Sequence, residues 1–199
     1  MEVIGYHGTN KEGAAGILAT KHVNPSSGEG HWLGSGAYFF QDAPARALVW
    51  ATHRFGIPRD DAVVVGCKID LSSCLDLFDQ AAFRQITRVY AQFQEYENRT
   101  GVVTSQYEIR VANGVVEFGP VDAPRGLAEN YRDHALLDWY VRLLRRRREE
   151  KITAIRGMFL YGRAIYKESF LFNWAHCQIA VREQTILSEP WLHHWESPV

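Results

Sequence analysis

The chain reads Trp32-Leu33-Gly34-Ser35-Gly36-Ala37-Tyr38-Phe39-Phe40, a glycine turn that runs directly into an aromatic strand. Glycine lets the backbone take positive φ angles or pass close to a ligand, and the aromatic run after the turn favours a β-strand. Side chains alternate between the two faces of a strand, so Tyr38 points away from Ala37 and Phe39. The segment alone leaves two interpretations open: a core strand after a turn, or a strand whose Tyr38 lines a ligand-binding cleft.

The composition is that of a globular protein with one domain. Of 199 residues, 46% are hydrophobic and 13% are aromatic, enough to bury a sizeable core. A formal net charge of -1 gives the whole molecule no attraction to nucleic acid or to an anionic membrane. The three cysteines form no Cys-x-x-Cys pair, which favours buried thiols over disulfides or a zinc site. Because we find neither a signal-peptide pattern nor an apolar run of ~18 residues, we expect a cytoplasmic protein with no membrane partner.

Strand and helix patterns occur together along the chain and predict an α+β fold. Strands are expected at 2–6, 37–40, 62–69, 152–160 and 176–181, and helices at 11–19, 43–53, 80–97 and 129–151. Thr9 or Asn10 is expected to cap the first helix, and Asp42 the second. We expect a single domain over 1–199 with an inserted hairpin and loop at about 101–126, because Asn113-Gly114 separates two β-prone runs.

Four arginines, Arg145 to Arg148, end the longest predicted helix. Such a run could bind phosphates of a nucleic acid. It could equally offset the helix dipole and pair with Glu149 and Glu150 that follow it. Both interpretations stay open.

Three motifs, in this order along the chain, resemble the ADP-ribosyltransferase superfamily of the diphtheria-toxin and poly(ADP-ribose) polymerase type. They are His7-Gly8-Thr9 after the first strand, Gly34-x-Gly36-x-Tyr38-Phe39-Phe40 at the second, and His176-Cys-Gln178-Ile-Ala-Val-Arg-Glu183 in a late strand. The last two are more similar to those of small bacterial members than to the eukaryotic polymerases. The resemblance implies a split, mixed β-sheet with flanking helices that binds NAD in the cleft between its two halves.

The first motif is expected to bind both ends of NAD. The resemblance implies that His7 binds the ribose on the adenosine side, that the backbone of Gly8 holds the nicotinamide carboxamide, and that Thr9 supports the turn. These roles suit the residue types, because a neutral imidazole offers one donor and one acceptor, and glycine permits close backbone approach. Taken alone, His7 could also be a hydrogen-bonded core histidine.

Aromatic and hydroxyl side chains are expected to complete the nicotinamide site. The resemblance implies that Tyr38 packs against the nicotinamide ring, that Tyr166 is a second stacking tyrosine, and that Ser169 bonds the carboxamide. Tyrosine supplies a flat apolar face with a polar tip, as this role requires. Either tyrosine could alternatively be a core aromatic.

Glutamine stands where the family usually has its third catalytic residue, a glutamate. Matching the late strand to that of the family puts Gln178 in this place, and strand alternation supports the match because it sets Gln178 on the polar face with Arg182. The resemblance therefore implies that Gln178 is catalytic, together with His7 and Tyr38. Glutamine can bind a ribose hydroxyl, but it carries no negative charge and cannot act as a base. Glu183 is the alternative if the strand bulges, and Asp133, Glu168 or the acceptor could supply a base.

These features predict a mono-ADP-ribosyltransferase that cleaves the nicotinamide–ribose bond of NAD and transfers ADP-ribose to a protein or nucleic acid. NAD is the co-substrate, and no metal is expected. We expect a bacterial toxin or defence effector, with an antitoxin or inhibitor protein as a further partner, and no elongation of poly-ADP-ribose chains. Two alternatives stay open: a catalytically weak NAD or ADP-ribose reader, and an NAD-dependent RNA 2′-phosphotransferase. For the latter, Arg46, Arg182 and the run Arg145 to Arg148 are the candidate basic residues.

Overall fold

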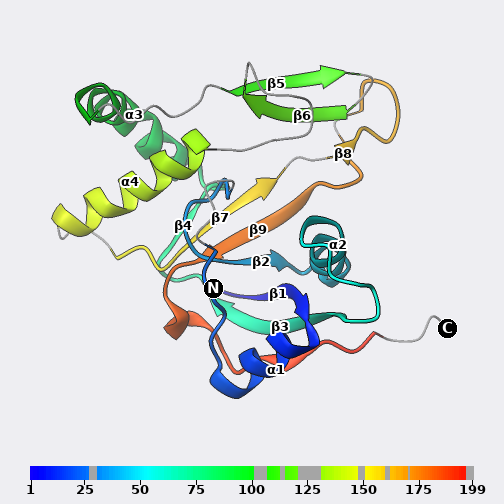
Figure 1. Ribbon diagram of the computed structural model, residues 1–199. Coiled ribbons are helices and arrows are strands. Elements are labelled where there is room, and N and C mark those ends of the chain that lie inside the picture. Colours follow the sequence, from blue (N-terminus) through cyan, green and yellow to red (C-terminus); the bar gives the residue numbers. More distant parts are fainter. Residues whose placement is uncertain are drawn as a thin grey trace.

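The computed structural model describes residues 1–26, 31–100, 107–112, 115–120, 131–147, 151–159, 162–169 and 171–195, with backbone alone at 54, 107–112, 115–120 and 131. In this part of the chain the fold is α+β, as expected. A seven-stranded, mostly antiparallel sheet carries four helices, and a three-stranded sheet stands beside it (Figure 1).

The strands of the main sheet are β1 (Glu2–Asn10), β2 (Ala37–Gln41), β3 (Ala62–Asp70), β4 (Cys74–Asp76), β7 (Ala154–Phe159), β9 (His176–Val181) and β10 (Trp191–Leu192). The smaller sheet contains β5 (Tyr107–Ala112), β6 (Val115–Pro120) and β8 (Gly162–Arg163). The helices are α1 (Lys11–Thr20), α2 (Pro44–Arg54), α3 (Gln80–Thr100) and α4 (Tyr131–Arg147).

The main sheet has the order β10-β3-β1-β2-β9-β7-β4. All neighbouring strands run antiparallel except β4 and β7, which are parallel. The first two strands of the chain therefore lie at the centre of the sheet, and the late strand β9 lies directly beside β2. This order brings the three motifs of the sequence onto adjacent strands.

Side-chain alternation along β9 divides the core into two layers. Ile179 and Val181 pack with α1 residues such as Ile17 on one face. Ala180 packs on the other face, where Leu137 and other residues of α4 cover the sheet. Figure 1 shows the same arrangement, with α1 on one side of the sheet and α3 and α4 on the other. The alternation predicted for this strand is confirmed.

The helix starts were predicted with mixed success. Asn10 caps α1, since its Oδ1 accepts a hydrogen bond from the Gly13 N–H at 2.8 Å. The prediction that Asp42 caps α2 is wrong, because Ala43 occupies the N-cap position without a side-chain bond. The N–H of Asp42 donates to the Ile4 carbonyl at 3.0 Å, so Asp42 still belongs to the contact between β1 and β2.

The predicted hairpin in the insertion forms. β5 and β6 pair antiparallel, with Ala112 opposite Val115, while the Asn113-Gly114 turn lies outside the described residues. β6 also pairs with β8, so the hairpin and the segment before β9 share one small sheet. The limits of the insertion stay a prediction.

The tryptophan-rich segment near the end of the chain packs back on the sheet as β10. Trp191 pairs with Gly66 of β3, and a Cβ built at Gly66 would lie 2.6 Å from Cε2 of the Trp191 ring. Ser188 and His193 on either side of this strand also bond to the β3 backbone. The absence of a side chain at Gly66 is therefore what lets the indole pack closely against β3.

We expect Gly66→Ala to lower the free energy of unfolding by about 1–3 kcal/mol, because the new methyl group overlaps the Trp191 ring. Denaturant unfolding measures the effect. In a Trp191→Ala background the same substitution should cost less, since the overlap is gone. Gly16→Ala in α1 is the matched control: its Cβ meets nothing within 4 Å, so it should stabilise the helix. Equal costs in both backgrounds would contradict the packing described.

Candidate functional site

The hydrogen-bonded ladder between β1 and β2 stops halfway along β1. The two strands pair at Gly5–Gln41 and at Tyr6–Phe40. β1 continues to Asn10, and it stays paired with β3 along its whole length. The pairing with β2 therefore ends directly before the His-Gly-Thr motif, at the centre of the sheet.

The side chain of His7 joins the two strands beyond the end of their ladder. Its Nδ1 lies 2.9 Å from the backbone carbonyl oxygen of Tyr38. A carbonyl only accepts, so Nδ1 carries the proton and Nε2 is left as an acceptor. Burial lowers the pKa of His7, which keeps the imidazole neutral. The ring is held against Phe39, with centroids 5.7 Å apart.

The backbone N–H and C=O of Gly8 point toward β2. In an antiparallel ladder these groups point to alternate sides at successive residues. The carbonyl of Ile4 accepts from the N–H of Asp42, which follows β2, so the polar groups of Gly8 take the same direction. The pairing with β2 has ended at this level, and the Tyr38 carbonyl accepts from His7 instead. Gly8 thus presents one donor and one acceptor side by side, as a primary amide requires.

Gly8 is also a packing requirement, which the sequence did not reveal. Helix α2 crosses β1 so closely that a Cβ at Gly8 would overlap the backbone carbonyl of Ala47. Gly8 is buried, and its missing side chain permits the close contact between α2 and β1.

The hydroxyl of Tyr38 is held by the glycine turn that precedes it. It accepts from the Leu33 N–H and donates to the Gly34 carbonyl, both at 2.9 Å. Gly34 has a φ of 79°, so the positive φ expected in this turn is confirmed. Burial raises the pKa of Tyr38, and the phenol stays protonated. The His31 ring lies on the tyrosine ring at 4.8 Å, which completes a fixed position for Tyr38.

Gln178 is buried on β9, and hydrogen bonds hold both ends of its amide. It is 3% exposed; its Oε1 accepts from the Trp32 indole N–H at 2.7 Å, and its Nε2 lies 2.8 Å from His176 Nε2. His176 donates from Nδ1 to the Trp174 carbonyl at 2.6 Å, so its Nε2 accepts from Gln178. Burial lowers the pKa of His176 to about 4, which keeps this acceptor neutral.

Tyr38 and Gln178 lie on the same face of the sheet. Tyr38 pairs with Ala180 and Phe40 pairs with Gln178, and directly opposite residues of an antiparallel pair share a face. By the same alternation His7 starts on the opposite face, and it reaches Tyr38 at its backbone. The structure therefore brings His7 into contact with Tyr38 and places Gln178 one strand further, beside the tyrosine.

The remaining residues of the predicted NAD site lie on β1 and in the turn before β9. Thr9 is half-buried on β1, next to the first turn of α1. Tyr166 is 64% exposed and Ser169 is buried, in one turn before β9. Ser169 donates its N–H to the Tyr166 carbonyl and accepts from the Leu171 N–H with its hydroxyl. The roles assigned to Tyr166 and Ser169 stay predictions.

The alternative carboxylates lie elsewhere on the surface. Glu183 follows β9 and pairs with Lys151 at 3.4 Å. Asp133 is exposed on α4, and Glu168 is exposed in the turn before β9.

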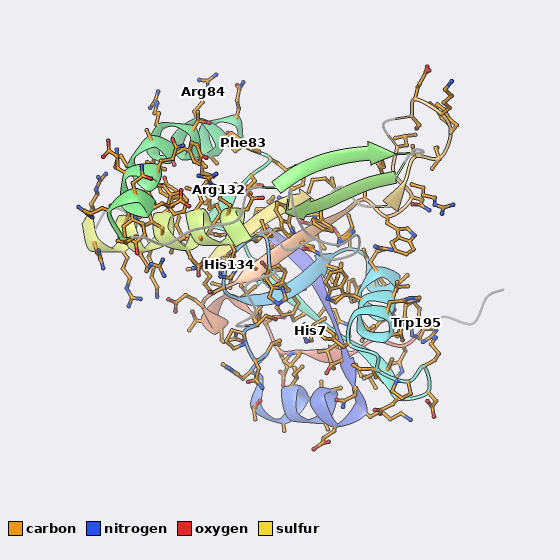
Figure 2. The ribbon with its side chains drawn as sticks, turned by 45° about the horizontal axis from the view of Figure 1, so that its top comes forward. His7, Phe83, Arg84, Arg132, His134 and Trp195 are labelled. Carbon is orange, nitrogen blue, oxygen red and sulfur yellow. The ribbon has the colours of Figure 1, made fainter. Side chains whose placement is uncertain are left out.

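A buried polar cluster on α4 holds the glycine turn, and our sequence analysis missed it. Asp138 accepts from the N–H and the hydroxyl of Ser35 and forms an ion pair with Arg182. His134 donates from Nδ1 to the His31 carbonyl at 2.9 Å. Figure 2 shows His134 and His7 near the middle of the view, whereas Arg84 projects outward from α3. The i, i+4 spacing of His134 and Asp138 on a predicted helix was the available signal.

The structure gives no sign of a metal centre in the part of the chain that it describes. No group of three or more histidine, cysteine, aspartate or glutamate side chains there is arranged to hold an ion. None of the helices in the described ranges is long and apolar enough to cross a membrane.

Comparison with known proteins identifies no family. No family model matches this chain, and no solved structure matches it. A segment of 37 residues, 19% of the chain, is 46% identical to the "Uncharacterized protein MJ0359" of Methanocaldococcus jannaschii. The match spans only 17% of the length of that relative. The case for a function therefore depends on the geometry of the site.

We expect Gln178→Glu to raise the pKa of His176 from about 4 to above 6, because a carboxylate beside Nε2 favours the imidazolium form. Nitrogen NMR of the imidazole ring measures this titration. Gln178→Met is the matched control, since it adds no charge and should leave the pKa low. An ordinary histidine titration in the wild-type protein would contradict the hydrogen-bond directions described for this network.

Proposed function

We propose that this protein is an NAD-dependent mono-ADP-ribosyltransferase. It cleaves the bond between nicotinamide and ribose and transfers ADP-ribose to a macromolecule. The split, mixed sheet of that superfamily is part of the proposal, as is the placement of the chain among its small bacterial members.

The early end of the β1–β2 ladder is the observation that carries the proposal. At this point His7 offers a neutral Nε2 acceptor, and Gly8 offers a backbone donor and acceptor toward β2. A ribose hydroxyl fits the first group and the nicotinamide carboxamide fits the second. The residues present therefore suit NAD at both positions without any rearrangement of the sheet order.

Tyr38 and Gln178 act beside this backbone site. The Tyr38 ring, held through its hydroxyl, packs against the nicotinamide ring. Gln178 hydrogen-bonds the ribose next to the bond that breaks, in an orientation set by Trp32 and His176. NAD supplies the reactive glycosidic bond, and the chain binds and orients it. Because Gln178 is neutral, another group must deprotonate the acceptor, which agrees with single rather than repeated transfer.

The acceptor is a protein or a nucleic acid. Arg145, Arg146 and Arg147 are exposed at the end of α4 and could contact phosphates. They also lie where basic residues favour a helix C-terminus, so they do not choose between the two acceptors. An inhibitor or antitoxin protein belongs to the same proposal, because an active transferase in its own cell requires control.

A second candidate function is an NAD or ADP-ribose reader. The observation that favours it is the environment of Gln178, which is 3% exposed and bonded at both ends of its amide. A neutral residue held in one orientation can bind NAD or ADP-ribose well, but it stabilises developing positive charge poorly. The 2′-phosphotransferase has less support, since Asp138 already compensates Arg182, and Arg46 lies over the Trp174 ring at 5.1 Å.

Incubation with NAD labelled in its adenylate phosphate tests the proposal directly. We expect label to appear in a protease-sensitive or nuclease-sensitive product of a cell lysate, with equal release of nicotinamide. Binding of NAD without release or transfer would replace the transferase with the reader. Absence of both binding and turnover would contradict the proposed site.

We expect His7→Ala to weaken NAD binding by about tenfold or more, because a buried hydrogen-bonding group is lost. Calorimetry measures the affinity. His53→Ala is the matched control, since His53 is exposed on α2 and far from the motif in sequence. Gln178→Ala should lower turnover more than affinity. Wild-type affinity and turnover in both site variants would show that NAD binds elsewhere.

A further inference from the structure

Asp138 is a buried carboxylate whose two oxygens are both engaged. It lies on α4 and is 9% exposed. Oδ1 accepts from the Ser35 N–H at 3.0 Å and contacts Arg182, and Oδ2 accepts from the Ser35 hydroxyl at 2.5 Å. Oδ2 also lies 3.5 Å from Nε2 of His134. A buried carboxylate that binds the Ser35 N–H, the Ser35 hydroxyl and the Arg182 guanidinium holds these donors in a fixed arrangement.

Asp138 binds Ser35, the residue that follows the two whose backbone groups hold Tyr38. Ser35 follows Leu33 and Gly34, whose backbone groups bond the tyrosine hydroxyl. The path from the carboxylate to the phenol thus consists of one hydrogen-bonded residue and its neighbours in a single turn. A movement of Ser35 must displace the two groups that hold Tyr38.

The shape of the turn is complementary to the ion pair. Gly34 has a positive φ, and a Cβ there would overlap Oδ1 of Asp138 and approach Nη2 of Arg182. The glycine therefore leaves the space that the carboxylate and the guanidinium occupy. This accounts for a part of the Gly34-Ser35-Gly36 pattern that ligand contact does not explain.

Arg182 brings a buried positive charge to the same place. It follows β9 and interacts electrostatically with Tyr38, and burial lowers the pKa of its guanidinium. Asp138 compensates this charge. Without the carboxylate, Arg182 would remain as an uncompensated cation beside the Tyr38 ring, which is proposed to pack against nicotinamide. Positive charge develops there as the glycosidic bond breaks, so the cation would oppose the reaction.

We propose that Asp138 is a positioning residue of the site, which fixes Tyr38 through Ser35 and neutralises Arg182 beside it. The effect of Asp138 on turnover rests on the proposed transferase function. The effect of Asp138 on the position of the glycine turn is independent of that function, so the two effects are tested separately.

The kinetic test compares Asp138→Asn with the double variant Asp138→Asn/Arg182→Gln. The single variant keeps the shape but leaves Arg182 unbalanced, so we expect kcat to fall about tenfold or more with little change in the KM for NAD. The double variant is neutral again and should recover several-fold in kcat. A purely structural role predicts that the second substitution causes further loss, and that result would overturn the electrostatic part.

The structural test measures hydrogen exchange at the amides of Leu33 and Ser35. Asp138→Asn should speed exchange at both by about tenfold, because a charge-assisted acceptor is lost. Asp133→Asn, at an exposed residue in the first turn of the same helix, is the matched control and should change neither. If Asp138→Asn fails to fold, Ser35→Ala is the substitute test. It removes only the hydroxyl donor, so exchange at Leu33 should still be faster than in the wild-type protein, by less than the tenfold expected for Asp138→Asn.

The two arms separate failure of the proposal from failure of the proposed function. Faster exchange in a protein without NAD turnover would retain Asp138 as the residue that positions Tyr38 and remove the transferase. Unchanged exchange at Leu33 in both Asp138→Asn and Ser35→Ala would overturn the positioning role, whatever the activity of the wild-type protein.

Discussion

The structure of the site depends on one hydrogen bond in the middle of the sheet, in which a side chain takes the place of a backbone donor. A side chain, the imidazole of His7, donates to the Tyr38 carbonyl at the level where the backbone of β1 would otherwise do so. Buried backbone groups must be paired, and this bond keeps the Tyr38 carbonyl satisfied while the two strands cease to pair. The same bond fixes the tautomer of His7 and leaves the polar groups of Gly8 directed at β2. A sheet that stayed fully paired here would have no backbone group to offer a ligand.

Two separate polar networks meet on the segment before Tyr38. Trp32 bonds Gln178 on β9, and Ser35 bonds Asp138 on α4. Both networks lie on the side of the sheet that α4 covers, and both restrain the same turn from different elements. Buried hydrogen-bond networks of this kind rigidify the residues that they join. The turn is therefore held by tertiary contacts, and its glycines provide the room for them.

Local rules of sequence predicted much of the fold and a part of the site. The strand period correctly pointed Tyr38 away from Ala37 and Phe39. Side-chain chemistry limited the cap of α1 to Thr9 or Asn10, and Asn10 forms it. The Asp42 cap failed because a tertiary bond to Ile4 holds this residue in the contact between β1 and β2. The ion pair of Asp138 and Arg182 joins residues far apart in the chain, and no periodicity reports such a pairing. The residues of the motifs could be identified in the sequence, whereas the residues that orient them became evident only in the structure.

The packing of β10 on β3 also affects how the molecule behaves among its copies. A two-residue strand, with bonds from Ser188 and His193 at its ends, covers the outer edge of β3. An uncovered edge presents a row of N–H and C=O groups that another chain can pair with. β3 is rich in buried valine and isoleucine, the kind of strand that stacks readily once exposed. The short strand and its flanking bonds therefore cover part of this edge and reduce the backbone that another chain could pair with.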